Sequence, residues 1–382
     1  MAYTFYLSLT IMHPAPGILL LFVALGLATL GAAPGPLPLA YARNFELVRH
    51  DSHTELTVRN ASRESDAVRR YALVPRQGPV PDLPPDLQVI RVPVRRVVAM
   101  ETVYLGHMEA LDALDRLVGA ATPDYISSPE VRSRLTKGNL AAVGSGARLD
   151  VERVLLLQPD LILTSVTGDP AFDVPAQLAR TGLPVVVSAD YMERHPLART
   201  EWIKVHGALF GREAEASAIF EEVADRYEAL RARTESVSRR PTVFAGAPYS
   251  GTWHMPGGRS YTAAAIADAG GDYLWADLET AGSLPLDTER VFLRASDADF
   301  WIHPGQYRSL ESLLGNDPRF VHFHAVRERQ VYNRTRQVTP QGGNPIWESG
   351  VVRPDQVLAD LIRILHPGLL PNHEFVFYEE LD

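Results

Sequence analysis

A short motif occurs twice in this chain, and it limits the folds that the chain can adopt. Residues 149–154 read LDVERV, and residues 286–291 read LDTERV, 137 positions later. In both places the spacing predicts a helix of about two turns, a turn that contains an Asp, and a buried strand. The two strands are expected at residues 161–163 and 300–302. Because one unit recurs, we expect two α/β lobes that are built alike, each with a parallel sheet.

The stretch from Arg212 to Ser236 separates the two copies and is typical of one long amphipathic helix. Its apolar residues recur at helical spacing, and charged residues occupy the other faces. It contains no Gly or Pro, and at about 1.5 Å per residue it would be on the order of 35 Å long. A shorter helical run, Glu201 to Phe210, precedes it and ends at Gly211. We interpret the long stretch as a strut between two lobes. One ordinary surface helix of a single α/β domain is the alternative.

Composition excludes several functional classes. The 382 residues suffice for two domains that each bury a core of their own. The formal net charge of −9 and the lack of long basic runs argue against a nucleic-acid partner. The chain contains no cysteine, which excludes disulfides, thiolate chemistry, cysteine-based metal sites and a lipid-modified N-terminal cysteine.

The N-terminal residues have the pattern of an export signal. Residues 18–30, ILLLFVALGLATL, form an apolar run of the length found in signal peptides and short for a membrane span. The small-residue site Ala40-Tyr41-Ala42 follows this run. We therefore predict an exported, periplasmic protein whose signal peptide, residues 1–42, is cleaved near Ala42. Initiation at Met12 instead of Met1, and retention of the leader as an anchor, stay open as alternatives.

The remaining chain divides into four parts by its local patterns. Alternating apolar residues predict a β-rich extension over residues 43–93, and strand and helix signals then alternate. The other expected parts are an N-terminal α/β lobe (94–200), linking helices (201–238) and a C-terminal α/β lobe (239–382). Ligands bind beyond the carboxyl ends of the strands in open parallel sheets, so two such lobes would face a shared cleft.

Aromatic residues gather in the predicted loops of the second lobe: Tyr249, Trp253, Tyr261, Trp275 and Trp347. Trp253 stands in the glycine-flanked segment Gly251–Gly258. An aromatic residue in such a loop is less easily explained by core packing than one at helix or strand period. We therefore interpret Trp253 as a candidate ligand contact, with a core position as the alternative.

Several longer segments carry a resemblance to a known family. They are LDVERV followed by PDLIL, YMERHPLARTEWIKVHGALFG from residue 191, PGGRSY, and WESGVVRPDQVLADLIRILHP near the C-terminus. With these segments the chain resembles the class III periplasmic substrate-binding proteins of ABC importers for iron complexes and cobalamin, over about residues 92–367. The resemblance implies two Rossmann-like lobes joined by a single long helix and a rigid cleft. It also implies a monomer that delivers a bulky metal chelate to a permease dimer at the inner membrane. The extension at 43–93 lies outside the family pattern.

The resemblance also implies which residues contact the ligand. In the first lobe the family's cleft loops correspond to Glu101–Tyr104, Gly144–Arg148 and Thr164–Gly168. Aromatic faces, with a few Arg or hydroxyl contacts, suit a large flat or metal-capped ligand. The implied contacts in both lobes are Thr102, Tyr104, Gly146, Ser165, Trp253, His254, Arg259, Tyr261 and Trp347.

The sequence leaves the identity of the ligand open. A ferric siderophore is the first expectation, cobalamin the second and haem the third, and no resident cofactor is expected. A bare metal ion would need several converging His, Asp or Glu ligands, whereas the twelve histidines are scattered. A Rossmann-type enzyme is the alternative from another class, but the chain has no complete dinucleotide motif and no nucleophile elbow.

Glu152 and Glu289 occupy equivalent places in the two copies of the repeat. Each falls in the first turn of a predicted helix that Asp150 or Asp287 is placed to cap, where a carboxylate is stabilised by the helix dipole. In the family that the chain resembles, acidic residues at the matching places pair with arginines of a two-fold symmetric permease. We therefore expect Glu152 and Glu289 to dock the protein to its permease, with helix capping alone as the alternative.

Overall fold

Two parallel sheets, a long helix and an N-terminal antiparallel sheet make up the part of the chain that the structure describes. In this computed structural model the described residues are 34–60, 68–166, 173, 178 and 181–382, and they belong to one unit that runs from Pro34 to Asp382. The apolar run at residues 18–30 lies outside the described residues. Within the described residues, no helix has both the length and the apolar character that a membrane crossing requires.

The first lobe contains a five-stranded sheet in the order β10-β9-β6-β7-β8, and every neighbouring pair is parallel. Numbered within the lobe this order is 3-2-1-4-5, as in a Rossmann half, so the order reverses between β6 and β9. The strands are β6 (Val97–Ala99), β7 (Leu117–Ala120), β8 (Ala141–Ala142), β9 (Leu161–Ser165) and β10 (Val185–Ser188). The helices of this lobe are α1 (Val103–Ala110), α2 (Pro129–Thr136) and α3 (Val151–Leu156).

The second lobe contains a sheet in the order β14-β11-β16-β17-β18, which is parallel except for its last strand. Here the order within the lobe is 2-1-3-4-5, and it reverses between β11 and β16. The strands are β11 (Thr242–Ala245), β14 (Asp272–Tyr273), β16 (Phe300–Ile302), β17 (Val331–Asn333) and β18 (Glu379–Glu380). A small antiparallel sheet lies beside it, with strands β12 (Pro248–Tyr249), β13 (Thr252–Pro256) and β15 (Ser283–Asp287). The helices are α8 (Tyr261–Asp268), α9 (Thr288–Ala295), α10 (Leu310–Asn316), α11 (His324–Arg327), α12 (Ser349–Val352) and α13 (Pro354–Leu365).

The sequence repeat corresponds to one structural unit in each lobe. It comprises α3 and β9 in the first lobe and α9 and β16 in the second, and each of these strands pairs with the first strand of its sheet. The turn residue before the strand has the same role in both copies. Asp160 accepts the backbone N–H of Arg95 at 2.9 Å, and Asp299 accepts that of Thr242 at 2.8 Å. The repeat therefore joins the start of one strand to the start of its neighbour in both lobes.

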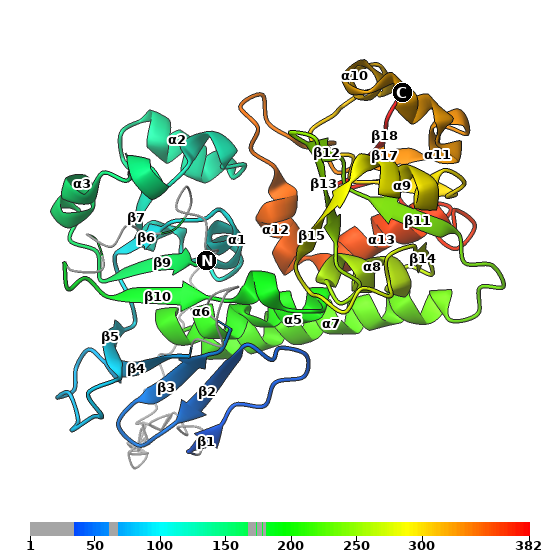
Figure 1. Ribbon diagram of the computed structural model, residues 1–382. Helices are drawn as coiled ribbons and strands as arrows, with labels where there is room; N and C mark the ends of the chain where they lie inside the picture. The colour runs from blue at the N-terminus through cyan, green and yellow to red at the C-terminus, as the bar shows by residue number, and fades with distance from the viewer. Residues whose placement is uncertain (1–33, 61–67, 167–172, 174–177, 179–180) are drawn as a thin grey trace, which may run out of the picture. The chain divides into compact units, whose positions relative to one another are not determined.

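Helix α7 (Glu213–Thr234) runs below both lobes in Figure 1 and confirms the predicted strut. It buries Phe220, Val223 and Tyr227 along one face, and it packs against α6 (Ile203–Phe210) and α13. The preceding helix ends at Gly211, whose φ of +66° is the left-handed conformation that glycine adopts without a Cβ clash. The expected run 201–210 is divided, because α5 (Pro196–Glu201) is a separate helix.

The two lobes also touch where α1 packs against α12. A Cβ added to Gly106 of α1 would lie 2.3 Å from the backbone oxygen of Glu348, so only glycine permits this approach. The Glu348 carboxylate accepts the backbone N–H groups of Ser127 and Ser128 at 2.6 and 2.9 Å. The close approach at Gly106 and the hydrogen bonds of Glu348 therefore hold the lobes together independently of the strut.

The N-terminal extension is a sheet in the order β1-β2-β3-β4-β5, antiparallel except between β4 and β5. Phe45 packs on Trp202 next to α6, with ring centroids 4.9 Å apart, and both side chains are buried. The predicted β-rich character of this part is confirmed. Its strands are β1 (Gly35–Pro36), β2 (Phe45–Arg49), β3 (Thr54–Val58), β4 (Arg69–Pro75) and β5 (Gln88–Val92).

Residues 34–42, which the sequence assigned to the signal peptide, pack with the extension, and cleavage near Ala42 stays a prediction. The fully buried Glu201 carboxylate accepts the backbone N–H groups of Ala40, Tyr41 and Ala42 at 2.8–2.9 Å. The ammonium group of Lys204 donates to the same carboxylate at 2.8 Å. Cleavage near Ala42 would remove the three backbone donors and leave a buried charged pair without them.

We predict that Glu201→Ala destabilises the fold strongly. The change removes the acceptor of three backbone N–H groups and leaves the Lys204 ammonium buried without its counter-charge, so we expect a loss of about 3 to 5 kcal/mol in the free energy of unfolding. Urea denaturation measures it. Glu213→Ala is the control, because Glu213 is exposed in the first turn of α7. Equal urea midpoints for the two variants would contradict the anchoring role of Glu201.

Candidate ligand-binding cleft

A cleft of about 680 Å³ lies between the lobes, beyond the carboxyl ends of the strands where each sheet reverses its order. Glu101 and Thr102 follow β6 and line it from the first lobe. Gly305 and Gln306 follow β16 and line it from the second. The cleft is therefore built at the switch points of both sheets, as expected for a ligand site of this fold class.

An adjoining compartment of about 360 Å³ continues the cleft into the second lobe. Tyr191, Tyr261 and Trp347 line both spaces, and Tyr249 and His254 line only the adjoining one. Small-molecule sites typically measure about 300 to 1,000 Å³, so the two spaces together suit a bulky ligand.

Carboxylates and an arginine form a buried network at the floor of the first lobe. Glu101 accepts the backbone N–H of Ser165 at 3.0 Å, and Asp190 accepts a hydrogen bond from the Arg199 guanidinium, also at 3.0 Å. Burial raises the pKa of Glu101 to about 7 against the opposing hydrogen bond from Ser165, and the negative charge of Asp190 raises this pKa further. Glu101 therefore changes its charge near neutral pH, at the surface that a ligand would contact.

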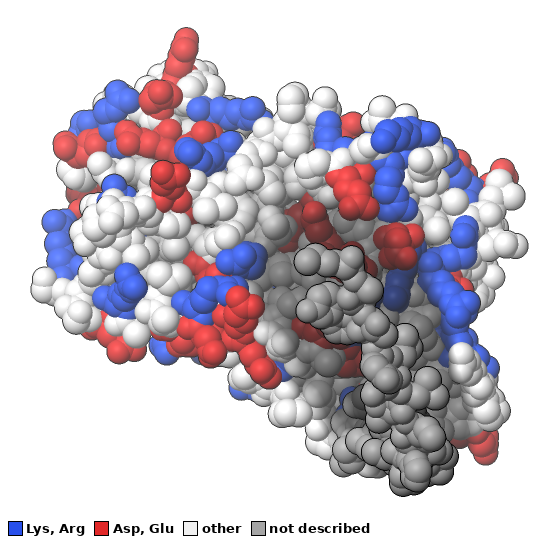
Figure 2. All heavy atoms as spheres, turned by 180° about the vertical axis from the view of Figure 1, so that it is seen from behind, with Lys and Arg blue, Asp and Glu red and all other residues white. Residues whose placement is uncertain are grey.

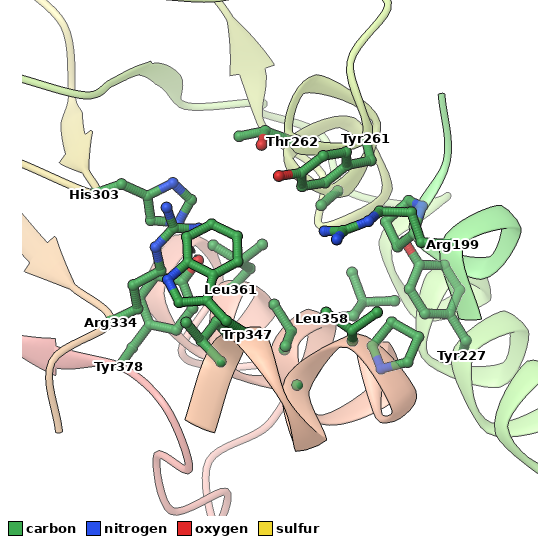
Figure 3. Close-up of a pocket in the computed structure, with 17 residues that line it drawn as sticks. Arg199, Tyr227, Tyr261, Thr262, His303, Arg334, Trp347, Leu358, Leu361 and Tyr378 are labelled. Atoms are coloured by element: carbon green, nitrogen blue, oxygen red, sulfur yellow. Dashed lines mark hydrogen bonds between the residues drawn. The ribbon is translucent and has the colours of Figure 1, made fainter. Parts of the chain in front are cut away.

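A further pocket, drawn in Figure 3, shares Arg199, Tyr261 and Trp347 with the cleft. Two arginines point into it from opposite sides, and each is stacked on an aromatic ring. The guanidinium carbon of Arg199 lies 4.4 Å from the centre of the Tyr261 ring, and that of Arg334 lies 4.3 Å from the centre of the Trp347 ring. Among the described residues, no carboxylate forms an ion pair with Arg334, and burial lowers the pKa of its guanidinium. An anionic ligand group would supply the missing counter-charge.

Charged side chains make this cleft basic although the whole chain is acidic. Three arginines, Arg199, Arg308 and Arg334, line the two spaces, against the carboxyl groups of Glu101 and Asp190. One of these carboxyl groups is partly neutral at pH 7, so the cationic groups are in excess. The geometry therefore favours a ligand with carboxylate, phenolate or other anionic oxygens.

The structure places four of the residues implied by the resemblance on the cleft or on the adjoining compartment. Thr102, Tyr261 and Trp347 line the cleft, and His254 lines the adjoining compartment. Ser165 is buried and does not line the cleft, but its backbone N–H donates a hydrogen bond to Glu101, which does. Gly146 is also buried, and its neighbour Ser145 lines the cleft. Contact with a ligand stays a prediction for all of them.

Trp253 is a core residue, which corrects the expectation that it contacts ligand. Its side chain is fully buried, its indole N–H donates to the Ala245 carbonyl at 2.9 Å, and its ring centroid lies 5.6 Å from that of Trp301. The stretch around it is strand β13, paired with β15, so the alternation of the strand turns Trp253 inward and His254 outward. The glycine-flanked segment read as a loop is therefore a strand.

Two further expected contacts do not line the cleft or the adjoining compartment. Tyr104 is buried in α1, with 1% of its surface exposed. Arg259 forms an ion pair with Glu279 and lines a separate pocket near α8. Burial and the nearby charges of Glu101 and Asp190 raise the pKa of Tyr104, so this side chain lies beneath the cleft floor and not on its surface. Arg259 is next to cleft residues in the sequence, but its side chain lines a different pocket.

The sequence reasoning missed the residues that make the cleft basic. Arg334 follows β17 directly, so the rule that ligands bind at carboxyl ends of strands could have identified it. Glu101 belongs to a loop that was expected to contact ligand, and it lines the cleft. Arg199 lies inside α5 and carries no such signal. Only the packing of α5 against the second lobe brings it to the cleft.

Comparisons with known proteins agree with this architecture. Residues 97–337 match the model of a family described as periplasmic binding protein. The chain belongs to the periplasmic binding protein family. Members of this family bind solutes for ABC transporters and are not enzymes. The family match confirms the resemblance read from the sequence, and the β-rich extension lies outside the matched residues.

Relatives of this periplasmic binding protein occur in archaea. An uncharacterized lipoprotein of Methanocaldococcus jannaschii is 26% identical over 364 residues, which cover 89% of this chain and 84% of the relative. A second uncharacterized lipoprotein of the same organism is 27% identical over 355 residues, which cover 88% of this chain and 85% of the relative.

Solved structures share the fold at low sequence identity. A periplasmic heme binding protein from Pseudomonas aeruginosa has a TM-score of 0.56 at 19% identity, and the match covers 76% of this chain and 98% of that one. An Fe3+-hydroxamate transport protein from Saccharomonospora viridis has a TM-score of 0.52 at 21% identity, with 69% and 93% covered. These matches confirm the two-lobed α/β fold.

We predict that an anionic ligand binds more tightly as the pH falls from 8 to 6. The pKa of Glu101 is about 7, so its carboxyl group is mostly ionised and repels the ligand at pH 8, and is mostly neutral at pH 6. The gain is limited by the fraction protonated, to about tenfold. Titrations at pH 6, 7 and 8, with a ligand of constant charge, measure it. Glu101→Gln should flatten the profile, and an unchanged profile in that variant would exclude Glu101 as the cause.

Proposed function

We propose that this protein captures an anionic metal chelate in the cleft, in the first place a ferric siderophore, and delivers it to a two-fold symmetric permease of an ABC importer. The observation that carries this proposal is the excess of guanidinium groups in the cleft of an acidic protein. Arg334, which stacks on Trp347, has no carboxylate partner among the described residues. The peripheral oxygens of a ferric chelate supply anionic acceptors of the kind that guanidinium forks bind.

Haem and cobalamin are the alternative ligands. Haem carries two carboxylates that the arginines could bind, and the adjoining compartment is lined by Tyr249 and His254, whose phenolic oxygen and ring nitrogen are of the type used as axial ligands. Cobalamin has a mostly amide periphery, so the excess of arginine favours it less. Titration with ferric hydroxamate, ferric citrate, haemin and cobalamin distinguishes them, because the Soret band of haemin shifts when Tyr249 or His254 ligates its iron.

We predict that the bound chelate quenches tryptophan fluorescence through Trp347. Of the five tryptophans, Trp347 is 36% exposed and lines the cleft, whereas the other four are buried. Trp347→Phe should therefore abolish most of the quenching. Arg334→Ala should weaken binding by about 1.5 to 3 kcal/mol, or roughly tenfold to a hundredfold, through loss of charge-assisted hydrogen bonds.

Arg259→Ala is the matched control for the arginine variant. Arg259 belongs to the same lobe but pairs with Glu279 outside the cleft, so its loss should leave affinity unchanged. Melting temperatures of both variants show whether they fold. If Arg334→Ala folds and binds every candidate as the parent protein does, the cleft does not recognise anions through this residue.

The two copies of the repeat present a matching pair of surfaces that suits docking to a symmetric partner. Glu152 and Glu289 are both exposed, each in the first turn of its helix. Leu156 and Leu293 follow four residues later on the same helix faces and are 83% and 86% exposed. Apolar side chains that expose most of their surface at equivalent places of both lobes fit a contact with a partner better than a solvated surface.

The alternative explanation, that the repeat only caps its two helices, is met in one copy and not in the other. The Asp150 side chain caps α3 by accepting the N–H of Arg153 at 2.9 Å. Asp287 makes no such bond, which corrects the expectation that both aspartates cap their helices. Glu289 lies 3.4 Å from Arg319, an exposed pair that contributes little to stability. The acidic residues are therefore available to a partner's arginines.

We predict that Glu152→Ala and Glu289→Ala each weaken uptake while leaving ligand affinity and melting temperature nearly unchanged. The double variant should abolish transport, because each lobe would lose its charge contact with one half of the permease. Leu156→Ser with Leu293→Ser should weaken uptake in the same way. Uptake of the chelate in cells that lack the native protein measures both effects. Normal uptake by both double variants would show that neither surface docks.

The location of the protein follows from the same proposal. The relatives named lipoproteins suggest an exported protein, but this chain has no cysteine to carry a lipid. We therefore infer export as a free periplasmic monomer or as a protein held by its N-terminal peptide. No nucleic-acid partner is expected, and on the face seen in Figure 2 basic and acidic side chains are interspersed outside the grey atoms.

A further inference from the structure

We propose that the hairpin between β2 and β3 holds a divalent transition-metal ion, such as Zn²⁺ or Cu²⁺, between His50, His53 and Glu55. This hairpin belongs to the N-terminal extension, which lies outside residues 97–337 that match the family and outside the cleft. Each of the three residues offers one ligand atom, and these atoms all lie within 4.8 Å of one another. The proposal is independent of the ligand that the cleft binds.

The tight turn of the hairpin sets the two imidazoles side by side. The backbone N–H of His50 donates to the His53 carbonyl at 2.8 Å and closes the turn. The two rings are stacked, with centroids 4.6 Å apart and planes 14° from parallel. Two imidazoles in this arrangement can present nitrogens to one ion without rebuilding the backbone, which lowers the entropy lost on binding.

Glu55 is oriented by bonds that use only one of its oxygens. The Arg70 guanidinium of β4 donates to Oε1 at 2.9 Å, and the Thr57 hydroxyl donates to the same atom at 3.2 Å. Oε2 receives no hydrogen bond among the described residues. The Glu55 carboxylate therefore offers Oε2 to a metal ion, while the hydrogen bonds to Oε1 hold the side chain in place.

His53 has the second contact that metal-binding histidines usually have. Its Nδ1 lies 3.1 Å from the Ser52 hydroxyl, and a proton on Nδ1 that is donated to this oxygen leaves the Nε2 lone pair for a metal.

The ligand set selects the class of ion. Two imidazole nitrogens and one carboxylate suit Zn²⁺, Cu²⁺ or Ni²⁺, whereas Mg²⁺ and Ca²⁺ prefer oxygen ligands only. Three protein ligands leave a further position for water. His50 directly follows β2, Glu55 lies in β3, and Glu55 is hydrogen-bonded to Arg70 of β4, so a bound ion would tie three strands of the extension together. We therefore expect metal to stabilise the extension.

The full-length protein tests this site with Zn²⁺ and Co²⁺ as probes. We expect one Zn²⁺ per chain by calorimetry, a higher melting temperature with Zn²⁺, and a visible absorption band with Co²⁺. The double variant His50→Ala/His53→Ala should lose all three effects, and Glu55→Gln should weaken Zn²⁺ binding at least tenfold. These residues lie at an exposed hairpin, so the variants should fold, and circular dichroism checks it.

His322→Ala/His324→Ala is the matched control. It also removes two nearby histidines, but from the second lobe and outside the extension, so Zn²⁺ binding and stabilisation should be unchanged. Stoichiometric binding that survives in the His50/His53 variant would overturn the proposal. The absence of a Co²⁺ band, or of any Zn²⁺ effect at micromolar concentration in the parent protein, would do the same.

Discussion

The contact between α1 and α12 is the constraint on which the cleft depends. The carboxyl ends of the two sheets can form one site only if the lobes keep a constant relation, and a single helix such as α7 would leave them free to twist. The bare Cα of Gly106 lets Glu348 come close, and the Glu348 carboxylate satisfies two backbone N–H groups at the start of α2. Packing and hydrogen bonding together therefore favour a preformed cleft over one that closes on its ligand.

The contact between the lobes also brings two arginines from distant parts of the chain into one pocket. Arg199 comes from a helix next to the strut and Arg334 from the end of a strand in the second lobe, yet both line one pocket. Each guanidinium rests on an aromatic face, which holds its position without neutralising its charge. Arg199 is paired with Asp190, whereas Arg334 is buried without a carboxylate partner among the described residues, and an anionic ligand would offset the cost of burying Arg334.

The extension is joined to the lobes by buried carboxylates that accept backbone N–H groups. Glu201 accepts those of residues 40–42, and Glu193 accepts those of Arg43 and Asn44, as well as the indole N–H of Trp202. Burial raises the pKa of Glu193 to about 7 against these hydrogen bonds. The backbone of residues 40–44 is therefore held by carboxylates of the segment before the strut, and the extension is an integral part of the structure.

Local patterns in the sequence determined the elements of this protein. The repeat at 149–154 and 286–291 predicted one α/β unit in each lobe, and the unbroken stretch before Ser236 predicted the strut, because helix and strand periods depend on neighbouring residues. Cleft residues that directly follow strands, such as Thr102, were predictable for the same reason. The tertiary structure alone decided that Trp253 faces the core, because the pairing of β13 with β15 sets which side of the strand is buried. It alone also brought Arg199 to the cleft, since this depends on how α5 packs, and packing between distant segments leaves no periodic trace in a single sequence.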